Sequence, residues 1–149
     1  MIAVIQRVSE AKVDVDGRTV GSCGKGFMIL LGVAEGDTET DMTLLADKIR
    51  KLRIFEDENG KMNKALTDVD GGILLISQFT LLANYAHGNR PDFFGAAKPA
   101  VAEPLFERFY AYIKEFIPKT EKGIFGADMK VSLVNDGPVT IVMDSKVLR

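Results

Sequence analysis

Few residue types in this sequence could carry out acid–base or nucleophilic chemistry. Its 149 residues include one histidine, His87, and one cysteine, Cys23. A zinc site built from histidine and cysteine needs three or four ligands, so the composition excludes one. A hydroxyl or thiol nucleophile paired with histidine would have to use His87, which lies in a segment rich in glycine and asparagine. We therefore expect no metal and no cofactor.

A polar run interrupts the most apolar stretch of the chain. Residues 73–82 begin with four apolar side chains and continue as Ser77-Gln78-Phe79-Thr80-Leu81, and we predict a central strand there. Buried polar side chains need hydrogen-bond partners, so Ser77, Gln78 and Thr80 indicate either a turn or a functional site. The pattern alone leaves both interpretations open.

A second stretch, Asn135-Asp136-Gly137-Pro138-Val139-Thr140, lies between two apolar, β-branched runs. The pattern predicts a strand over residues 129–134, a tight turn and a second strand over residues 139–143, which together form a hairpin. Pro138 is unusual at the start of a strand because it fixes φ and removes a backbone donor. The alternative to a simple turn is a rigid backbone tip whose carbonyl oxygens face a ligand.

The remaining pattern consists of short strands joined by turns, with two helices. Asp16-Gly17 predicts a hairpin turn, and Gly24 and Gly26 separate that hairpin from a continuous apolar run. Strands are predicted over residues 2–8, 13–15, 19–22, 27–33, 54–56 and 73–82. This order of elements favours an α+β fold, mainly antiparallel, with both helices on one face of the sheet.

Two amphipathic stretches predict the helices. The first follows Asp37 or Thr38, either of which suits the N-cap. The second spans residues 103–116, with Pro104 suited to its first turn and Pro118 ending it. Each helix has an apolar stripe that should face the sheet, formed by Met42, Leu45, Ile49 and Leu52 in the first and by Leu105, Phe106, Phe109, Ile113 and Phe116 in the second.

Composition limits the environment and the partners. With 46% hydrophobic and 27% charged residues, the chain is typical of one globular domain over residues 1–149. The single cysteine suits a reducing cytoplasm, and we expect neither a signal peptide nor a membrane span. The net charge of −2 gives no general sign of nucleic-acid binding, so such a partner would need a local positive patch.

Two segments could provide such a patch. Lys48, Arg50, Lys51 and Arg53 crowd the end of the first helix, where they either favour the helix dipole or contact phosphates. The long irregular segment 84–99 also contains Arg90, Lys98 and the pair Phe93-Phe94. Its charges and aromatic rings could meet a nucleic-acid end, although phenylalanines commonly anchor a loop to the core.

The chain resembles one known family. The motifs Ser77-Gln78-Phe79-Thr80-Leu81 and Asn135-Asp136-Gly137-Pro138-Val139-Thr140 are similar to the paired signatures of the D-aminoacyl-tRNA deacylases, also called D-tyrosyl-tRNA deacylases. Both occur in the family's order and at its spacing. Further stretches that resemble the family are residues 3–8, 52–57, 61–63, 90–91 and 125–129, so the resemblance covers essentially the whole chain.

The resemblance implies a deacylase-type fold with barrel-like strands and a homodimer that hydrolyses the ester between a D-amino acid and the 3′-terminal adenosine of tRNA. Glycine mischarged onto alanine tRNA would also be removed, and neither DNA nor a membrane would be a partner. The tip of one subunit, with a cis Gly137–Pro138 bond, would enter the partner's pocket. Carried over from the family, the pocket would be lined by Ser77, Gln78, Phe79 and Thr80, the tip braced by Arg7, and the adenosine placed near Phe125 and Ala102.

The implied selection has a physical logic. If the carbonyl oxygens of Gly137 and Pro138 fill the space that an L side chain needs, any L residue clashes, whereas D residues and glycine fit. Thr80 could be a nucleophile, but no histidine stands beside it in sequence. We favour a mechanism in which the terminal 2′-OH of the tRNA assists attack, while backbone amides near Phe79 and Thr80 stabilise the oxyanion.

Two other functions remain open at this point. One is a non-catalytic dimeric module that binds RNA or nucleotides on the same fold. The other is a relative in the same superfamily that edits L-alanine, although Asn135-Asp136-Gly137-Pro138 fits the D-specific pattern better. The chain also departs from the family in residues 84–90, which are less basic than the usual loop, so the resemblance does not imply tRNA contact there.

Overall fold

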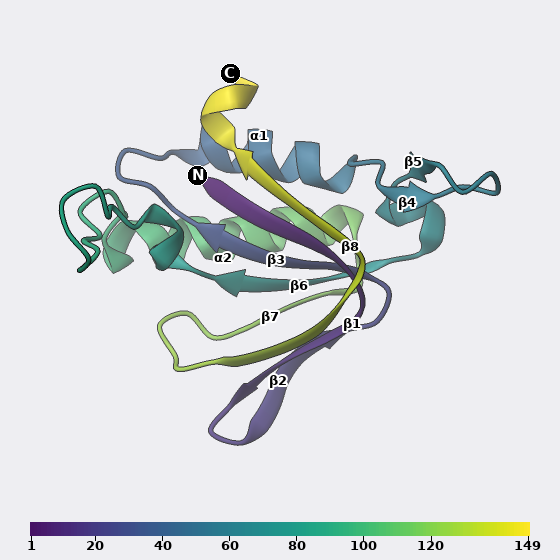
Figure 1. Cartoon of the computed structure of the whole chain (residues 1–149), viewed down its shortest axis with the longest axis horizontal. Coiled ribbons are helices and arrows are strands. Elements are labelled where there is room, and N and C mark those ends of the chain that lie inside the picture. The colour runs from purple at the N-terminus through teal and green to yellow at the C-terminus, as the bar shows by residue number, and fades with distance from the viewer.

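The computed structural model describes residues 1–149 and contains a mixed six-stranded sheet, a small two-stranded sheet and two α-helices (Figure 1). The strands of the large sheet are β1 (Ile2–Val15), β2 (Arg18–Cys23), β3 (Gly26–Gly32), β6 (Gly72–Ser77), β7 (Thr120–Lys122) and β8 (Lys130–Asp144). The small sheet consists of β4 (Phe55–Glu56) and β5 (Met62–Lys64). The helices are α1 (Glu39–Arg50) and α2 (Pro99–Phe116), and three short 3₁₀ helices are η1 (Leu66–Val69), η2 (Phe79–Leu82) and η3 (Ser145–Leu148).

The strand β1 organises the large sheet. It pairs antiparallel with β3 and β2 along one edge and with β8 along the other. The order β3–β6–β7 then continues in parallel. The sheet curls so far that a side chain on Gly21 in β2 would lie 2.7 Å from the carbonyl oxygen of Lys122 in β7. The result is the nearly barrel-shaped α+β architecture that the sequence predicted, with parallel pairs that it did not.

Both helices pack on one face of the sheet, as predicted, and lie side by side (Figure 1). The apolar core between them and the sheet includes Phe27 and Ile29 of β3, Leu45 of α1 and Phe109 of α2. A smaller core on the other face of the sheet fills the curl, and it consists of Val8, Ala11, Val13, Met28, Leu74 and Ile76. None of the helices has both the length and the apolar character needed to cross a membrane.

Local capping explains where the helices begin. Thr38 is the N-cap of α1, one of the two predicted residues, and it forms a capping box with Asp41. The helix α2 begins at Pro99, earlier than the predicted residue 103. Proline is favoured at the first helical position because its missing N–H has no intrahelical partner there. Pro104, predicted for the first turn, therefore lies inside the helix.

The predicted strand over residues 73–82 ends at Ser77. From Phe79 the chain turns into the 3₁₀ helix η2, so the polar run does mark a turn. The Gln78 N–H donates to the carbonyl oxygen of Leu31 at 2.9 Å, which holds the start of the turn against the end of β3. Close packing here requires Gly32, because a Cβ at that position would lie 2.7 Å from Leu82 and 2.9 Å from the Gln78 oxygen.

The predicted hairpin over residues 129–143 is wrong. The strand β8 is continuous over 15 residues and pairs antiparallel with β1. The register places Thr140 opposite Gln6 and Asn135 opposite Val8, so residues 136–139 form a bulge opposite Arg7. Because β1 is long enough to pair with both apolar runs, the runs continue in one direction instead of folding back on each other.

Candidate active site

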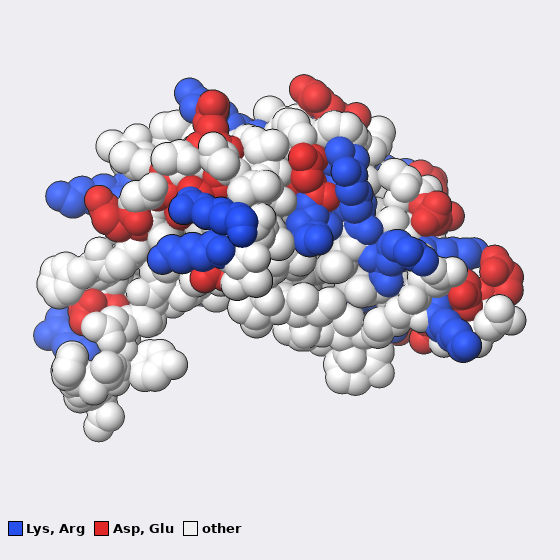
Figure 2. All heavy atoms as spheres, turned by 90° about the horizontal axis from the view of Figure 1, so that it is seen from above, with Lys and Arg blue, Asp and Glu red and all other residues white.

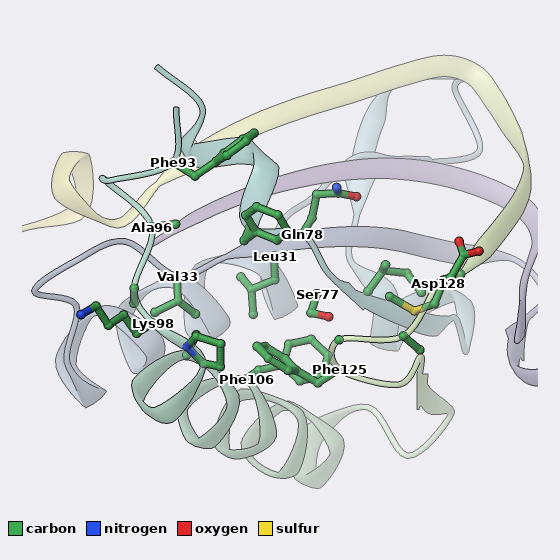
Figure 3. A pocket seen from close by; sticks show the side chains of 18 of the residues that line it. Leu31, Val33, Ser77, Gln78, Phe93, Ala96, Lys98, Phe106, Phe125 and Asp128 are labelled. Atoms are coloured by element: carbon green, nitrogen blue, oxygen red, sulfur yellow. The ribbon is translucent and has the colours of Figure 1, made fainter. Parts of the chain in front are cut away.

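A cavity of about 580 Å³ opens at the carboxyl ends of β3 and β6. In Figure 3, Gln78 and Phe93 lie on one side of this cavity and Phe106 and Phe125 on the other, with Ser77 between them. The lining is predominantly apolar with a few polar groups, which is the usual composition of a small-molecule site. The full set of lining residues is Leu31, Val33, Ile76, Ser77, Gln78, Phe79, Phe93, Ala96, Ala97, Lys98, Pro99, Ala102, Phe106, Phe125, Gly126, Ala127, Asp128, Met129 and Val131.

Five of the predicted site residues meet in this cavity. Ser77, Gln78 and Phe79 come from the end of β6 and the turn that follows, whereas Ala102 comes from α2 and Phe125 from the loop after β7. The polar run in the sequence therefore marks a turn that also borders a cavity.

Aromatic contacts hold the walls of the cavity. The rings of Phe106 and Phe125 lie 6.0 Å apart between centroids, and those of Phe79 and Phe93 lie 5.0 Å apart in an edge-on arrangement. Phe79 remains 57% exposed, so much of its side chain stays accessible. Flat apolar surfaces of this kind suit the face of a nucleobase.

Thr80 lies beside the cavity but not in its lining. Its side chain is exposed, and its hydroxyl oxygen accepts a hydrogen bond from the Gln78 side-chain amide. An amide cannot take up the hydroxyl proton, so this contact does not activate Thr80 as a nucleophile. The cysteine is no better suited, because burial, helped by the charge of Glu121, raises the pKa of the Cys23 thiol to about 11.

The long segment before α2 is tied to the body by backbone hydrogen bonds. Asn84 and Asp92 exchange two of them, at 2.8 and 2.9 Å, and the Ala97 N–H donates to the Val33 oxygen at 2.9 Å. Phe93 and Lys98, singled out from the sequence, line the cavity, whereas Arg90 does not.

Several lining residues escaped the sequence-based prediction. Leu31 and Val33 were assigned only to a buried strand, and Phe106 only to the apolar stripe of a helix. Each serves both purposes, because the cavity opens where the main core ends. Residues 126–129 belong to a stretch that resembles the family, but no role was predicted for them. Gly126, which has a φ of +79°, turns the chain there.

The bulge of β8 is braced by a buried arginine. Arg7, only 6% exposed, donates from Nε to the carbonyl oxygen of Asp136 at 3.0 Å and from one terminal nitrogen to the Ile54 oxygen at 2.7 Å. Within the bulge, the Val139 N–H donates to the Asn135 side-chain oxygen at 3.1 Å. Gly137 and Pro138 are exposed, and the bond between them is cis.

The structure does not bring this bulge to the cavity of its own chain. Arg7 is paired with Phe27 near the start of β3, whereas Ser77 is paired with Leu31 at the other end of that strand. In Figure 1 the bend of β8 lies on the right, near β4, and the turn after β6 lies on the left. Gly137 and Pro138 are therefore at the opposite end of the molecule from Ser77, Gln78, Phe79 and Thr80.

Comparison with known proteins identifies related chains. The family model described as D-Tyr-tRNA(Tyr) deacylase matches residues 4–144. A D-aminoacyl-tRNA deacylase from Geobacter sulfurreducens is 57% identical over 146 residues, which cover 98% of this chain and 96% of the relative. Its counterpart from Thermus aquaticus is 54% identical over 145 residues, covering 97% and 95% of the two chains.

A solved structure extends the similarity to the fold. The c-Myc DNA Unwinding Element Binding Protein is 39% identical and superposes with a TM-score of 0.91, covering 97% of this chain and 98% of its own. The fold described above is therefore shared with this relative over nearly the whole length of both chains.

Proposed function

The chain belongs to the D-Tyr-tRNA(Tyr) deacylase family, and we propose that it hydrolyses the ester between a D-amino acid or glycine and the 3′-terminal adenosine of tRNA while sparing L-aminoacyl-tRNA. It is an enzyme that acts on ester bonds, because its relatives are named D-aminoacyl-tRNA deacylases and an amino acid is joined to tRNA by an ester. We place the reaction in the cytoplasm, and the single free cysteine accords with a reducing compartment.

The observation that carries this proposal is the cavity bordered by the Ser77–Thr80 turn. Its volume of about 580 Å³ can accept a nucleoside with a small ester attached. We place the adenine ring beside Phe125 and the small Ala102, which both line the cavity, and the ester at the turn formed by Ser77, Gln78 and Phe79. This placement follows the role near the adenosine that the resemblance implies for Ala102 and Phe125.

Hydrolysis proceeds without a protein nucleophile in this proposal. The N–H groups of Phe79 and Thr80 begin η2, where no preceding helical carbonyl can accept them, so they are free to stabilise the oxyanion of the tetrahedral intermediate. The 2′-OH of the terminal ribose neighbours the ester and assists the attack of water. The protein contributes position and backbone donors, in keeping with a site that holds no histidine.

Selection against L-amino acids is assigned to Gly137 and Pro138 of a second subunit. The bulge is exposed and braced by Arg7, and it lies at the far end of the molecule from the cavity of its own chain. A tip so placed can enter only the cavity of another copy, so we propose a homodimer. Backbone atoms there would occupy the space of an L side chain and ignore its chemistry, which leaves D residues and glycine as substrates.

One assay tests this function. The protein is incubated with D-tyrosyl-, L-tyrosyl-, glycyl- and L-alanyl-tRNA, and the loss of each ester is measured. We expect loss of the D-tyrosyl and glycyl esters with both L esters spared. Binding of tRNA without hydrolysis would instead support a non-catalytic RNA-binding module, and selective loss of L-alanyl-tRNA would support an L-alanine editor.

A further inference from the structure

The end of α1 carries positive charge that the proposed active site does not use. Lys48, Lys51 and Arg53, which we call the 48–53 patch, are exposed, and none of them forms an ion pair. Arg50 is different, because it pairs with Asp47 at 2.9 Å and lies 3.7 Å over the ring of Phe116. The patch therefore has three positive charges without an ion pair on one short segment, although the carboxylate of Asp68 lines the groove beside Lys51 and Arg53.

The surface around the patch is shaped as well as charged. A groove of about 300 Å³ runs beside it, lined by Lys51 and Arg53 together with Thr67 and Asp68 of η1. Arg53 is fixed in this groove, since its Nε donates to the Asn63 carbonyl oxygen at 2.8 Å. Figure 2, which looks onto α1, shows Lys and Arg atoms gathered over this end of the molecule, toward the β4–β5 hairpin, with acidic atoms among them.

A single side chain links the patch to the tip of β8. The guanidinium of Arg7 bonds the Asp136 oxygen in the bulge and also the oxygen of Ile54, the residue that directly follows the patch. Because Arg7 is buried and holds both segments, the patch and the tip form one rigid unit. That unit lies at the opposite end of β3 from the cavity of the same chain.

We propose that the 48–53 patch binds backbone phosphates of the acceptor arm of a tRNA whose 3′ end occupies the cavity of the partner subunit. This inference rests on the proposed function, in which the tip of one subunit enters the partner's cavity. Because the patch and the tip form one rigid unit, a tip that enters the partner's cavity brings the patch to the mouth of that cavity. Each subunit then binds the acceptor arm of the tRNA whose 3′ end lies in the other subunit's cavity.

The chemistry of the patch fits phosphate better than bases. Lysine ammonium groups act as point charges toward phosphate oxygens, and such contacts carry no sequence information. Phe116 is the one aromatic side chain that lines the groove, and the Arg50 guanidinium already lies over its ring at 3.7 Å from the centroid, where a base would otherwise stack. The patch should therefore act on any acceptor stem and should weaken with rising salt.

A charge-reversed variant tests the contact. Lys48→Glu with Lys51→Glu is compared with Lys12→Glu with Arg18→Glu, which makes the same change of net charge on the β1–β2 hairpin. For each protein, kcat/KM is measured with D-tyrosyl-tRNA and with a D-tyrosyl ester of the isolated 3′-terminal CCA trinucleotide. We expect the ratio of kcat/KM for the tRNA to kcat/KM for the trinucleotide to fall about tenfold in the first variant and to stay unchanged in the second. The value of kcat/KM for the tRNA should also depend less steeply on salt in the first variant. An unchanged ratio in the first variant, or an equal fall in both, would overturn the proposal.

Mixed dimers test whether the contact crosses the interface. One subunit carries Lys48→Glu and Lys51→Glu with an intact cavity, and the other carries Ala102→Phe, which fills its cavity, with an intact patch. If the patch serves the partner, the mixed dimer has the wild-type substrate ratio, and a ratio as low as that of the double-lysine homodimer would overturn the proposal. Should the Ala102→Phe chain not fold, Ala96→Phe blocks the cavity from another wall.

The outcomes also separate this inference from the function beneath it. A wild-type protein that is monomeric by sedimentation, or inert toward D-tyrosyl-tRNA, would contradict the proposed function itself. A dimeric, active wild type whose patch variant keeps its substrate ratio would contradict the patch alone.

Discussion

Arg7 Nε donates a hydrogen bond of 3.0 Å to the carbonyl oxygen of Asp136, although the two residues are separated by 129 positions in the chain. The contact joins the first strand to the bulge of the last one and buries a guanidinium to do so. A planar guanidinium can serve two carbonyl oxygens in fixed directions at once, which is what Asp136 and Ile54 receive here. The position of the bulge thus depends on the shape of one side chain as well as on its charge.

Replacing Arg7 with lysine should therefore be costly despite the retained charge. A single ammonium cannot reproduce both hydrogen bonds, so we expect the free energy of unfolding to fall by about 2 kcal/mol. Displacement of the tip should lower kcat/KM for D-tyrosyl-tRNA about tenfold to a hundredfold. Urea unfolding and ester hydrolysis measure the two effects, with Arg18→Lys as the exposed control. Wild-type activity in Arg7→Lys would contradict the bracing role.

A methyl group at Gly137 should be poorly tolerated. A Cβ there would lie 2.8 Å from Val139 Cγ2 and 3.2 Å from Arg7, and the φ of +139° is one that L side chains rarely adopt. We expect Gly137→Ala to destabilise the fold by about 1–3 kcal/mol and to reduce deacylation. Gly24→Ala is the matched control, because its Cβ would meet nothing within 4 Å. Equal stability of the two variants would show that the bulge yields freely.

The hydroxyl of Thr80 should be dispensable. Since its only side-chain partner is the Gln78 amide, nothing activates it, and we expect Thr80→Ala to hydrolyse D-tyrosyl-tRNA within about threefold of wild type. A substrate with a 2′-deoxy terminal adenosine should instead be hydrolysed about 10²–10⁴-fold more slowly, which is the usual contribution of a positioned acid or base. Single-turnover hydrolysis measures both. The reverse pattern would make Thr80 the nucleophile.

Asp41 should make the fold sensitive to acid. Its burial acts to raise the carboxyl pKa, but hydrogen bonds from the Thr38 N–H, the Ser145 hydroxyl and Arg149 outweigh burial and hold the pKa at about 2, below the ordinary 3.8. The stabilisation is complete above about pH 4 and is lost as the pH falls through about 2.

The variant Asp41→Asn isolates this contribution. An amide cannot accept all of these hydrogen bonds, so we expect about 2 kcal/mol less stability at pH 7 and a flatter dependence between pH 4 and pH 2. Denaturant titrations at several pH values provide the measurement, and the exposed Asp128→Asn serves as control. If the free energy of unfolding of the Asp41 variant depended on pH as steeply as that of the wild type, another carboxylate would govern the acid transition.

Local signals predicted much of the fold because they act over a few residues. The Asp16-Gly17 hairpin and the Thr38 cap of α1 depend on turn and capping chemistry that neighbouring residues decide. The parallel pairing of β6 with β3 and the continuity of β8 depend on partners far away in the chain. The wrong prediction of a hairpin at Gly137 has this cause. Whether residues 129–134 and 139–143 fold back on each other or continue as one strand depends on the length of β1, which pairs with both.

The site was predictable in part for the same reason. Ser77 and Gln78 were conspicuous as polar groups in an apolar strand, a pattern that indicated either a turn or a site, whereas Phe79, Ala102 and Phe125 were named only through the family resemblance. The apolar lining from Leu31, Val33 and Phe106 could not be told from core residues, since a cavity wall and a core contact require the same side chains.

The continuity of β8 predicts how discrimination against L-aminoacyl-tRNA should depend on temperature. The bulge at residues 136–139 is held at both ends by ladder pairs with β1, at Thr140 and at Asn135, so it cannot swing as the tip of a free hairpin can. Its backbone should open only when the sheet opens, so the selection against L-amino acids that we propose for Gly137 and Pro138 would be coupled to melting of the whole fold. Discrimination would then stay level as the temperature rises and fail abruptly at the melting point, instead of eroding by degrees below it.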